Sequence, residues 1–161
     1  MTVTEYNTCV TQHADGVFRF IVKNIRDTEK ARDIVQDTFE KLWIKVADLD
    51  ASKVKSYLFT TAYHTMIDVI RREKFQGDFE QVDEVLYVAQ NSFSDVKSVL
   101  NEALLKLPAV QRSVVLLRDY EGYNYEEIGQ ITGLNESQVK VYIYRARVFL
   151  KEYIGSLDKV I

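Results

Sequence analysis

Residues 124–151 read NYEEIGQITGLNESQVKVYIYRARVFLK, and this stretch decides the fold of the second half of the chain. Asn124 and Asn135 each begin a capping box, in which the N-cap side chain and an acid or amide three positions later satisfy each other's backbone N–H groups. Gly133 stands between the two boxes, where a helix that has ended favours a left-handed residue. The sequence therefore predicts two short helices joined by about three residues, which is the helix-turn-helix pattern. A further helix is predicted ahead of them, at residues 108–120.

The second helix of this pair combines a buried stripe with a basic surface. The stripe follows the helical period and consists of Val139, Ile143, Ala146 and Leu150. The basic surface carries Lys140, Tyr144, Arg145, Arg147 and Lys151. The N-terminus of such a helix can enter the major groove of DNA; the alternative is the solvated basic face of an ordinary helical hairpin. Gly129, inside the first helix, costs about 1 kcal/mol relative to alanine, and we expect close approach of the second helix to be the reason for it.

The N-terminal half shows three helical patterns, at about residues 5–24, 28–46 and 53–74. The second pattern is preceded by a capping residue, Asp27 or Thr28. One apolar stripe runs along it at the helical period: Ala31, Ile34, Val35, Thr38, Phe39, Leu42, Trp43 and Val46. We expect Phe39 and Trp43 to belong to the core. The opposite face is polar and carries Lys30, Asp33, Gln36, Asp37, Glu40, Lys41 and Lys45.

The third predicted helix is apolar on two faces and basic at its end. One face carries Val54, Leu58, Thr61, Ala62, Thr65 and Val69. The other carries Phe59, Tyr63, Met66 and Ile70. A helix that is apolar on two faces is either buried on both or offers its rings to a partner. The rings seal a small bundle in the first case; in the second, rings and basic groups together would stack on unpaired bases.

Composition and charge define the domain organisation. With 161 residues, one proline and six glycines, the chain has room for one ordinary domain or two small helical ones. Residues 76–95 contain five acids and no base, whereas the net charge of the whole chain is only −3. We therefore predict an all-α protein of two small helical domains, a bundle (1–75) and a helix-turn-helix domain (98–161), joined by a flexible acidic linker (76–97).

Several classes of protein are excluded by what the sequence lacks. Cys9 is the only cysteine, which excludes a disulfide framework and a multi-cysteine zinc site. The sequence holds no clustered metal ligands, Gly-rich phosphate loop or nucleophile with a base, so we expect no catalysis, no cofactor and no metal. The first residues lack a signal-peptide pattern, and apolar runs of about four residues are far shorter than a membrane span. We expect a soluble, cytoplasmic protein without membrane insertion.

In their order along the chain, these segments resemble an extracytoplasmic function (ECF) sigma factor of bacterial RNA polymerase, group IV of the sigma-70 family. The resemblance covers about residues 15–75 and 98–155. It is carried by ARDIVQDTF (31–39), LW (42–43), YLF (57–59), IDVIRR (67–72), LP (107–108), VLLR (115–118), residues 122–133, VK (139–140) and RAR (145–147). The resemblance implies a factor that binds core polymerase and directs initiation at specific promoters.

The resemblance also implies roles for three sets of residues. The polar face of the second helix would dock on the polymerase clamp through Asp33, Gln36, Asp37 and Glu40. The loop at 48–56 and the third helix would recognise and open the −10 element through Lys53, Lys55, Tyr57, Tyr63, His64, Arg71 and Arg72. The helix-turn-helix domain would bind the −35 element through Arg118, Gln138, Lys140, Tyr144, Arg145 and Arg147. Lys140, Tyr144 and Arg145 would lie nearest the bases, and Arg118 and Arg147 would hold phosphates. The expected partners are the clamp and flap of core polymerase and promoter DNA, and the family permits an anti-sigma factor between the two halves.

Two departures from the family pattern fall at DNA-reading positions. His64 stands where the family usually has asparagine, and Val141 and Tyr142 stand where small polar and basic residues are common. We therefore expect a promoter sequence that differs from the usual one. The residues by themselves leave two other functions open. One is a stand-alone helix-turn-helix regulator whose N-terminal bundle dimerises or senses a ligand, and the other is a helical adaptor that does not bind DNA.

Overall fold

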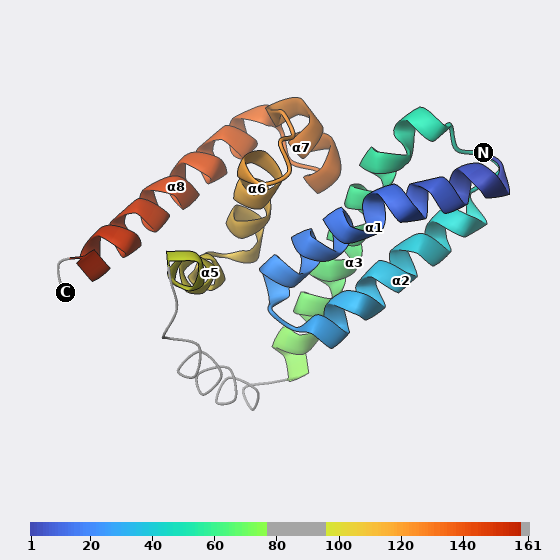
Figure 1. The fold of residues 1–161 in the computed structure, drawn as a ribbon. Helices are drawn as coiled ribbons and strands as arrows, with labels where there is room; N and C mark the ends of the chain where they lie inside the picture. Colours follow the sequence, from blue (N-terminus) through green and yellow to red (C-terminus); the bar gives the residue numbers. More distant parts are fainter. Residues whose placement is uncertain (77–95, 159–161) are drawn as a thin grey trace.

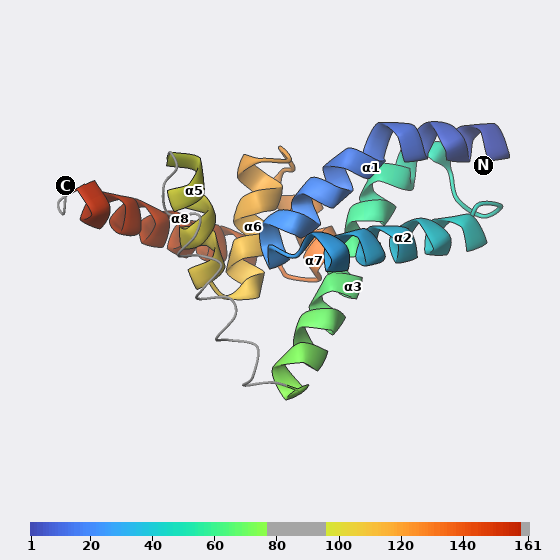
Figure 2. The same cartoon turned by 60° about the horizontal axis from the view of Figure 1, so that its bottom comes forward.

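The computed structural model describes residues 1–76 and 96–158, in which all regular structure is helical. The elements are α1 (Val3–Ile25), α2 (Thr28–Ile44), the 3-10 turn η1 (Ala51–Lys53), α3 (Val54–Gln76), α5 (Val96–Lys106), α6 (Ala109–Asp119), α7 (Tyr125–Thr132) and α8 (Glu136–Asp158). They form two groups, α1–α3 and α5–α8, which lie side by side (Figures 1 and 2). The protein is all-α, as predicted, and residues 77–95 of the predicted linker lie outside the described residues.

The first group is a bundle in which α1, α2 and α3 pack against one another. Its centre is formed by side chains such as Val17, Ile21 and Leu42, which are 0% exposed. Asp27 is the N-cap of α2, since its side chain accepts a hydrogen bond from the N–H of Lys30 at 3.1 Å. The predicted start of α2 is thereby confirmed.

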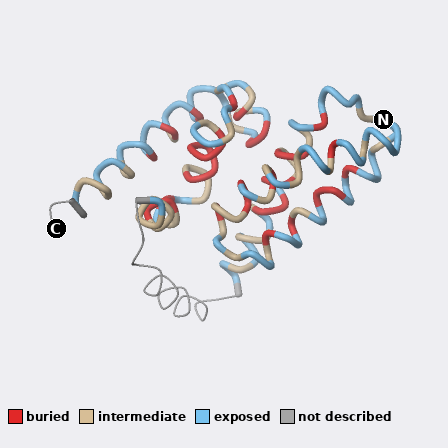
Figure 3. Tube along the Cα trace, in the orientation of Figure 1, coloured by how far each residue is buried: buried red, intermediate tan, exposed pale blue. Residues whose placement is uncertain are grey.

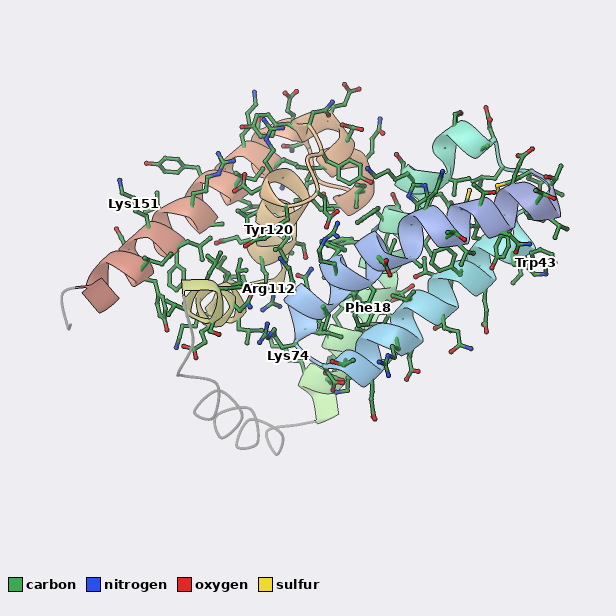
Figure 4. All side chains as sticks on the ribbon, in the orientation of Figure 1. Phe18, Trp43, Lys74, Arg112, Tyr120 and Lys151 are labelled. Carbon is green, nitrogen blue, oxygen red and sulfur yellow. The ribbon has the colours of Figure 1, made fainter. Side chains whose placement is uncertain are left out.

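Trp43 departs from the predicted core of α2. Its side chain is 47% exposed, whereas Phe39, one turn earlier, is 8% exposed. Trp43 lies beside the N-terminal end of α1 (Figure 4), where the Tyr6 ring meets it edge-on at a centroid distance of 4.9 Å. Trp43 belongs to the last turn of α2, which ends at Ile44. At this end of the stripe the indole packs against Tyr6 of α1 and otherwise stays half exposed. The prediction for Phe39 is confirmed, and that for Trp43 is wrong.

The second apolar face of α3 is buried, which decides between the two alternatives for its rings. Phe59, Tyr63 and Met66 are 1%, 4% and 0% exposed. The Phe59 ring packs at 5.7 Å from the ring of Phe20 in α1 and at 5.3 Å from the ring of Tyr123, which precedes α7. These side chains therefore seal the packing on both sides of α3, inside the bundle and toward the second group.

The second group contains the predicted helix-turn-helix. The side chain of Asn124 accepts from the Glu127 N–H at 2.8 Å, and the Glu127 carboxylate accepts from the Asn124 N–H at 3.0 Å. Asn135 and Gln138 form the same pair of bonds at 2.8 and 3.0 Å at the start of α8. Gly133 ends α7 with φ of 80°. Both capping boxes and the left-handed glycine are therefore confirmed, and each rests on hydrogen bonds between near neighbours in the sequence.

Gly129 is close to the turn between the two helices. A Cβ atom at this position would lie 2.8 Å from the carbonyl oxygen of Leu134. The close neighbour is therefore the backbone of the turn that leads into α8. The sequence-based expectation of close approach by the second helix itself misplaced this contact by a few residues.

We expect Gly129→Ala to lower the free energy of unfolding by about 1–3 kcal/mol, because the added methyl group must displace backbone rather than a flexible side chain. Gly155→Ala is the matched control, since that glycine also lies inside a helix but a Cβ there would meet nothing within 4 Å. The control should be neutral or stabilise the chain by up to about 1 kcal/mol. Urea unfolding followed by circular dichroism measures both, and an unchanged stability of Gly129→Ala would contradict the steric argument.

The two groups share a buried polar cluster. Asn24 in α1 and Ser113 in α6 are both 0% exposed, and Arg112 is 8% exposed. The Ser113 hydroxyl donates to Asn24 Oδ1 at 3.0 Å, and Arg112 Nε donates to the same oxygen at 3.4 Å. Arg112 also donates to the carbonyl of Leu105 at 3.3 Å, and it lies between the two groups in Figure 4. These hydrogen bonds stabilise the interface while the two groups stay in contact. If the groups separated, the same polar atoms would form hydrogen bonds with water instead.

Charged and aromatic contacts surround this cluster. Arg19 binds the Glu121 carboxylate with two hydrogen bonds of 3.1 and 3.0 Å. The Lys23 ammonium lies 3.6 Å from the centre of the Tyr120 ring. Among the described residues the buried hydroxyl of Tyr123 has no hydrogen-bond partner, and burial followed by the charge of Glu121 raises its pKa. The two predicted domains therefore meet through a continuous buried surface.

The Arg19–Glu121 pair allows this contact to be measured. The side chains are 49% and 6% exposed, so the carboxylate is largely covered while the guanidinium is half in solvent. We expect a double-mutant cycle of Arg19→Ala and Glu121→Ala, measured by urea unfolding, to give a coupling energy of about 1 kcal/mol, the upper end for partly exposed pairs. A coupling energy of zero would show that the two groups do not meet through this pair in solution.

Candidate nucleic-acid and polymerase interfaces

In the second group, one side of α8 is buried and the other faces solvent; we call the second side the outward face of α8. α8 packs on α5, α6 and α7 through Val139, Ile143 and Ala146, which are at most 1% exposed. The opposite side of α8 follows the outer edge of the molecule and is largely exposed (Figure 3). The second capping box and Gly133 fix the N-terminal end of α8 relative to α7. This is the geometry in which a recognition helix offers its first turns to a DNA groove.

Two of the predicted −35 residues at this end have contacts within the chain. Gln138 closes the capping box, because its Oε1 accepts from the backbone N–H of Asn135 at 3.0 Å. Lys140 forms an ion pair with Glu136 at 3.4 Å and lies 5.6 Å from the centre of the Tyr125 ring. Gln138 is therefore partly occupied by helix capping, whereas Lys140 is held at the side of α8 that faces α7.

Two predicted arginines are also held by the fold. Arg147 donates to both carboxylate oxygens of Asp119, with Nε 3.2 Å from Oδ2, and this hydrogen bonding raises the pKa of its guanidinium. Arg118 donates to the carbonyl of Tyr123 at 3.0 Å, and its guanidinium lies 4.9 Å from the centre of the Tyr125 ring. Both arginines keep part of their donor capacity for a phosphate, but their positions are fixed by contacts inside the second group.

Tyr144 and Arg145 complete the predicted set. Tyr144 is 70% exposed, Arg145 is exposed, and neither has a partner in the described parts of the chain. A shallow hollow at the start of α8 is lined by Asn135, Ser137, Gln138, Val141, Tyr142 and Arg145. Val141 was noted from the sequence only as a departure from the family pattern. Val141 lies outside the buried stripe of α8, and this position in the pattern indicates exposure. Its side chain is 44% exposed.

The predicted −10 residues separate into an outer and an inner set. The outer set is exposed and consists of Lys53, His64, Arg71 and Arg72. Tyr57 lies on the same side, because seven residues make nearly two helical turns from Tyr57 to His64 and again to Arg71. Tyr57 is half-buried, and its hydroxyl donates to the Lys41 carbonyl at 3.4 Å. One side of α3 therefore carries the Tyr57 ring, the His64 imidazole and the Arg71 guanidinium in a row.

The inner set consists of Tyr63, which is buried, and Lys55, which is exposed but lies toward the second group. Tyr63 is 4% exposed, and burial raises the pKa of its phenol, so its ring is not available at the surface in this arrangement. The Lys55 ammonium lies 5.1 Å from the centre of the Tyr123 ring in the second group. The pKa of His13 is lowered by burial and then by the charge of Lys55. The structure therefore separates these two residues from the row on the outer side of α3.

The polar face of α2 contains an exposed acidic set, which lies beside Lys30, Lys41 and Lys45 on the same face. Asp33, Gln36, Asp37 and Glu40 are all exposed and lie within about two helical turns. Among the described residues, neither Asp33 nor Asp37 has a hydrogen-bond or ion-pair partner. We call this set the α2 acidic face. Unpaired carboxylates at helical spacing are suited to bind a basic surface on another protein.

Within 1–76 and 96–158 no group of three or more His, Cys, Asp or Glu side chains is arranged to hold a metal ion. None of the helices in those ranges combines the length and apolarity that crossing a membrane requires. The features with clear chemistry are the outward face of α8, the outer side of α3 and the α2 acidic face. They define a helix-turn-helix, DNA-binding class of protein with an added helical bundle.

Comparison with known proteins identifies the family within this class. The family described as Sigma-70 region 2 matches residues 9–76, and the family described as Sigma-70, region 4 matches residues 98–150. The RNA polymerase sigma factor YlaC of Bacillus subtilis is 32% identical over 152 residues, covering 88% of this chain and 87% of the relative. The ECF RNA polymerase sigma factor SigM of the same organism is 30% identical over 145 residues, covering 86% and 88%.

Solved structures agree on the fold. The sigma factor RpoE in complex with the anti-sigma factor NepR from Bartonella quintana has a TM-score of 0.75 at 22% identity, covering 95% of this chain and 98% of that one. CnrH in complex with the cytosolic domain of CnrY has a TM-score of 0.70 at 22% identity, covering 94% and 88%. The chain belongs to the sigma-70 family, in its ECF group, and is an RNA polymerase sigma factor.

Proposed function

We propose that this sigma factor directs core polymerase to promoters through three surfaces that lie on three different helices. The outward face of α8 reads the −35 element, the outer side of α3 engages the opened −10 element, and the α2 acidic face docks on the polymerase clamp. The observation that carries the proposal is the helix-turn-helix geometry, in which two capping boxes and Gly133 hold α8 with Arg145 exposed. The proposed functional units are the helical bundle (1–75), the acidic linker (76–97) and the helix-turn-helix domain (98–161).

The outer side of α3 suits a single strand better than a duplex. Tyr57 and His64 are rings on the same side as Arg71, and rings with cationic groups bind unpaired bases regardless of sequence. Phe59 and Tyr63 are excluded from this role in the present arrangement because they are buried. A non-template strand would therefore stack on Tyr57 and His64 while its phosphates meet Lys53 and Arg71.

The charge of the chain fits a factor that acts together with the polymerase. At a net charge of −3, the chain lacks the basic excess that gives a free protein affinity for DNA. Core polymerase would supply most of that affinity, and the chain would act in the cytoplasm without catalysis of its own. A stand-alone regulator would instead bind duplex DNA unaided. An anti-sigma factor as a further partner stays a prediction.

Reconstituted transcription tests the proposed function. Purified chain is added to bacterial core polymerase on genomic fragments, and transcript starts are mapped. We expect discrete starts that require the chain, and no gel shift of the same fragments by the chain alone. A shift without polymerase, with steep salt dependence, would favour the stand-alone regulator. Transcription that is unchanged by the chain would remove the proposal.

A further inference from the structure

The centre of the outward face of α8 is apolar, although the surface around it is polar. On a helical projection the buried residues Val139, Ile143 and Ala146 lie on one side, and Val141 and Val148 lie opposite them. These two valines are 44% and 37% exposed. Val141 lies within two turns of the N-terminus of α8, in the hollow described above, whereas Val148 lies two turns further along. The part of α8 nearest a groove therefore presents a branched apolar side chain.

The polar side chains beside Val141 are not equally free to read a base. The Oε1 atom of Gln138 accepts from the Asn135 N–H at 3.0 Å. Bidentate reading of adenine uses both ends of the amide, and in Gln138 the capping bond already takes one lone pair of Oε1 and fixes the direction of the side chain. Arg145, one turn after Val141, is exposed and has no partner among the described residues. Arg145 is therefore the one charged side chain that lines the hollow with Val141, and it is without a partner in the described residues.

The chemistry of the major groove specifies what an apolar side chain can recognise there. The C5-methyl group of thymine is the apolar group that base edges present in the major groove, and guanine presents the two acceptors that a guanidinium binds. From this we infer, on the basis of the −35 role proposed above, that Val141 contacts the methyl group of a thymine in the −35 element. That thymine lies next to the base pair that Arg145 reads. Val141 is thus a specificity-determining residue, and Val148 is not.

Uracil substitution tests this contact, because it removes the methyl group and leaves the base pairing unchanged. Duplexes carry the upstream element of a start mapped in the transcription assay, and each thymine on either strand is replaced in turn by uracil. Binding is measured with the reconstituted holoenzyme. We expect one thymine at which the wild-type holoenzyme loses about fourfold in affinity, the effect of one buried methyl group. Other positions should change little.

Val141→Ala assigns the contact to the residue. The variant holoenzyme should bind the thymine and uracil duplexes equally well at that position, and Val148→Ala, the same change two turns away, should keep the fourfold difference. Both side chains are exposed, so neither change disturbs the core. Loss of the difference in Val148→Ala alone, or its persistence in Val141→Ala, would overturn the assignment.

Failure of this inference differs from failure of the proposed function. A holoenzyme that prefers its upstream element over scrambled DNA, yet responds to uracil at no position, would overturn the methyl contact and leave −35 reading intact. An element without an A·T pair would do the same. A holoenzyme that shows no preference for the upstream sequence would overturn both.

Discussion

Replacing Asp37 by arginine is expected to abolish retention of the chain by core RNA polymerase. Asp37 is exposed at the centre of the α2 acidic face, where no other described residue pairs with it. If this face meets a basic surface on the clamp, the substitution exchanges an attraction for a like-charge contact, which costs several kcal/mol. Co-purification of tagged polymerase with the variant measures the effect, and we expect at least a hundredfold loss of bound chain.

Two further variants separate a lost contact from a lost fold. Asp37→Asn removes the charge without reversing it and should give an intermediate loss. Glu5→Arg makes the same change of charge at an exposed position in the first turn of α1 and should leave retention unchanged. All three should keep the circular dichroism spectrum and melting temperature of the parent within a few degrees, because exposed side chains contribute little to stability. Normal retention of Asp37→Arg would show that the clamp binds elsewhere.

The parts of the fold that were predictable from the sequence depend on neighbours in the chain. The capping boxes at Asn124 and Asn135 join residues three positions apart, and Gly133 is required by a local backbone angle. Apolar stripes at helical spacing gave the three helices of the first group. Such signals are local because both partners of each interaction stand within one turn of helix.

The contact between the two groups could not be predicted in the same way. Asn24 and Ser113 are separated by 89 positions, and a lone asparagine or serine in a helical pattern is expected to face water. Trp43 shows the same limitation for an apolar residue that stays exposed, because the periodic stripe of α2 does not reveal where the neighbouring helix ends. Long-range packing decides which members of an apolar or polar pattern are buried.

The predicted −35 residues show where the sequence pattern and the structure differ. The family resemblance assigns Gln138, Arg118, Arg145 and Arg147 to the −35 element, with Arg145 near the bases and Arg118 and Arg147 on phosphates. In the structure, Gln138 accepts a capping hydrogen bond, Arg147 binds the carboxylate of Asp119, and Arg118 donates to the carbonyl of Tyr123. Arg145 is exposed and has no such partner in the part of the chain that the structure describes. These four residues therefore differ in their contacts within the chain, and the contacts predict different mutational effects.

Arg145→Ala is expected to weaken binding of the holoenzyme to its −35 element by about 1–3 kcal/mol, because a guanidinium that reads guanine through two hydrogen bonds supplies that discrimination. The loss should appear at one base pair: the variant should bind duplexes changed at that pair as well as it binds the original. Melting temperature should not change, since Arg145 has no partner among the described residues. Binding to duplexes with single base changes, measured with wild-type and variant holoenzyme, gives the position of the contact.

Arg147→Ala is the matched control for this experiment, since it removes the same group from the same helix. Its guanidinium is held by Asp119 at the flank of α8, where a groove wall would bring a phosphate rather than a base. This variant should weaken binding to all duplexes alike and reduce the slope of log affinity against log salt by about 1. If Arg145→Ala behaved in this uniform way instead, Arg145 would be a phosphate contact, and base reading by α8 would depend on Val141 and Tyr144.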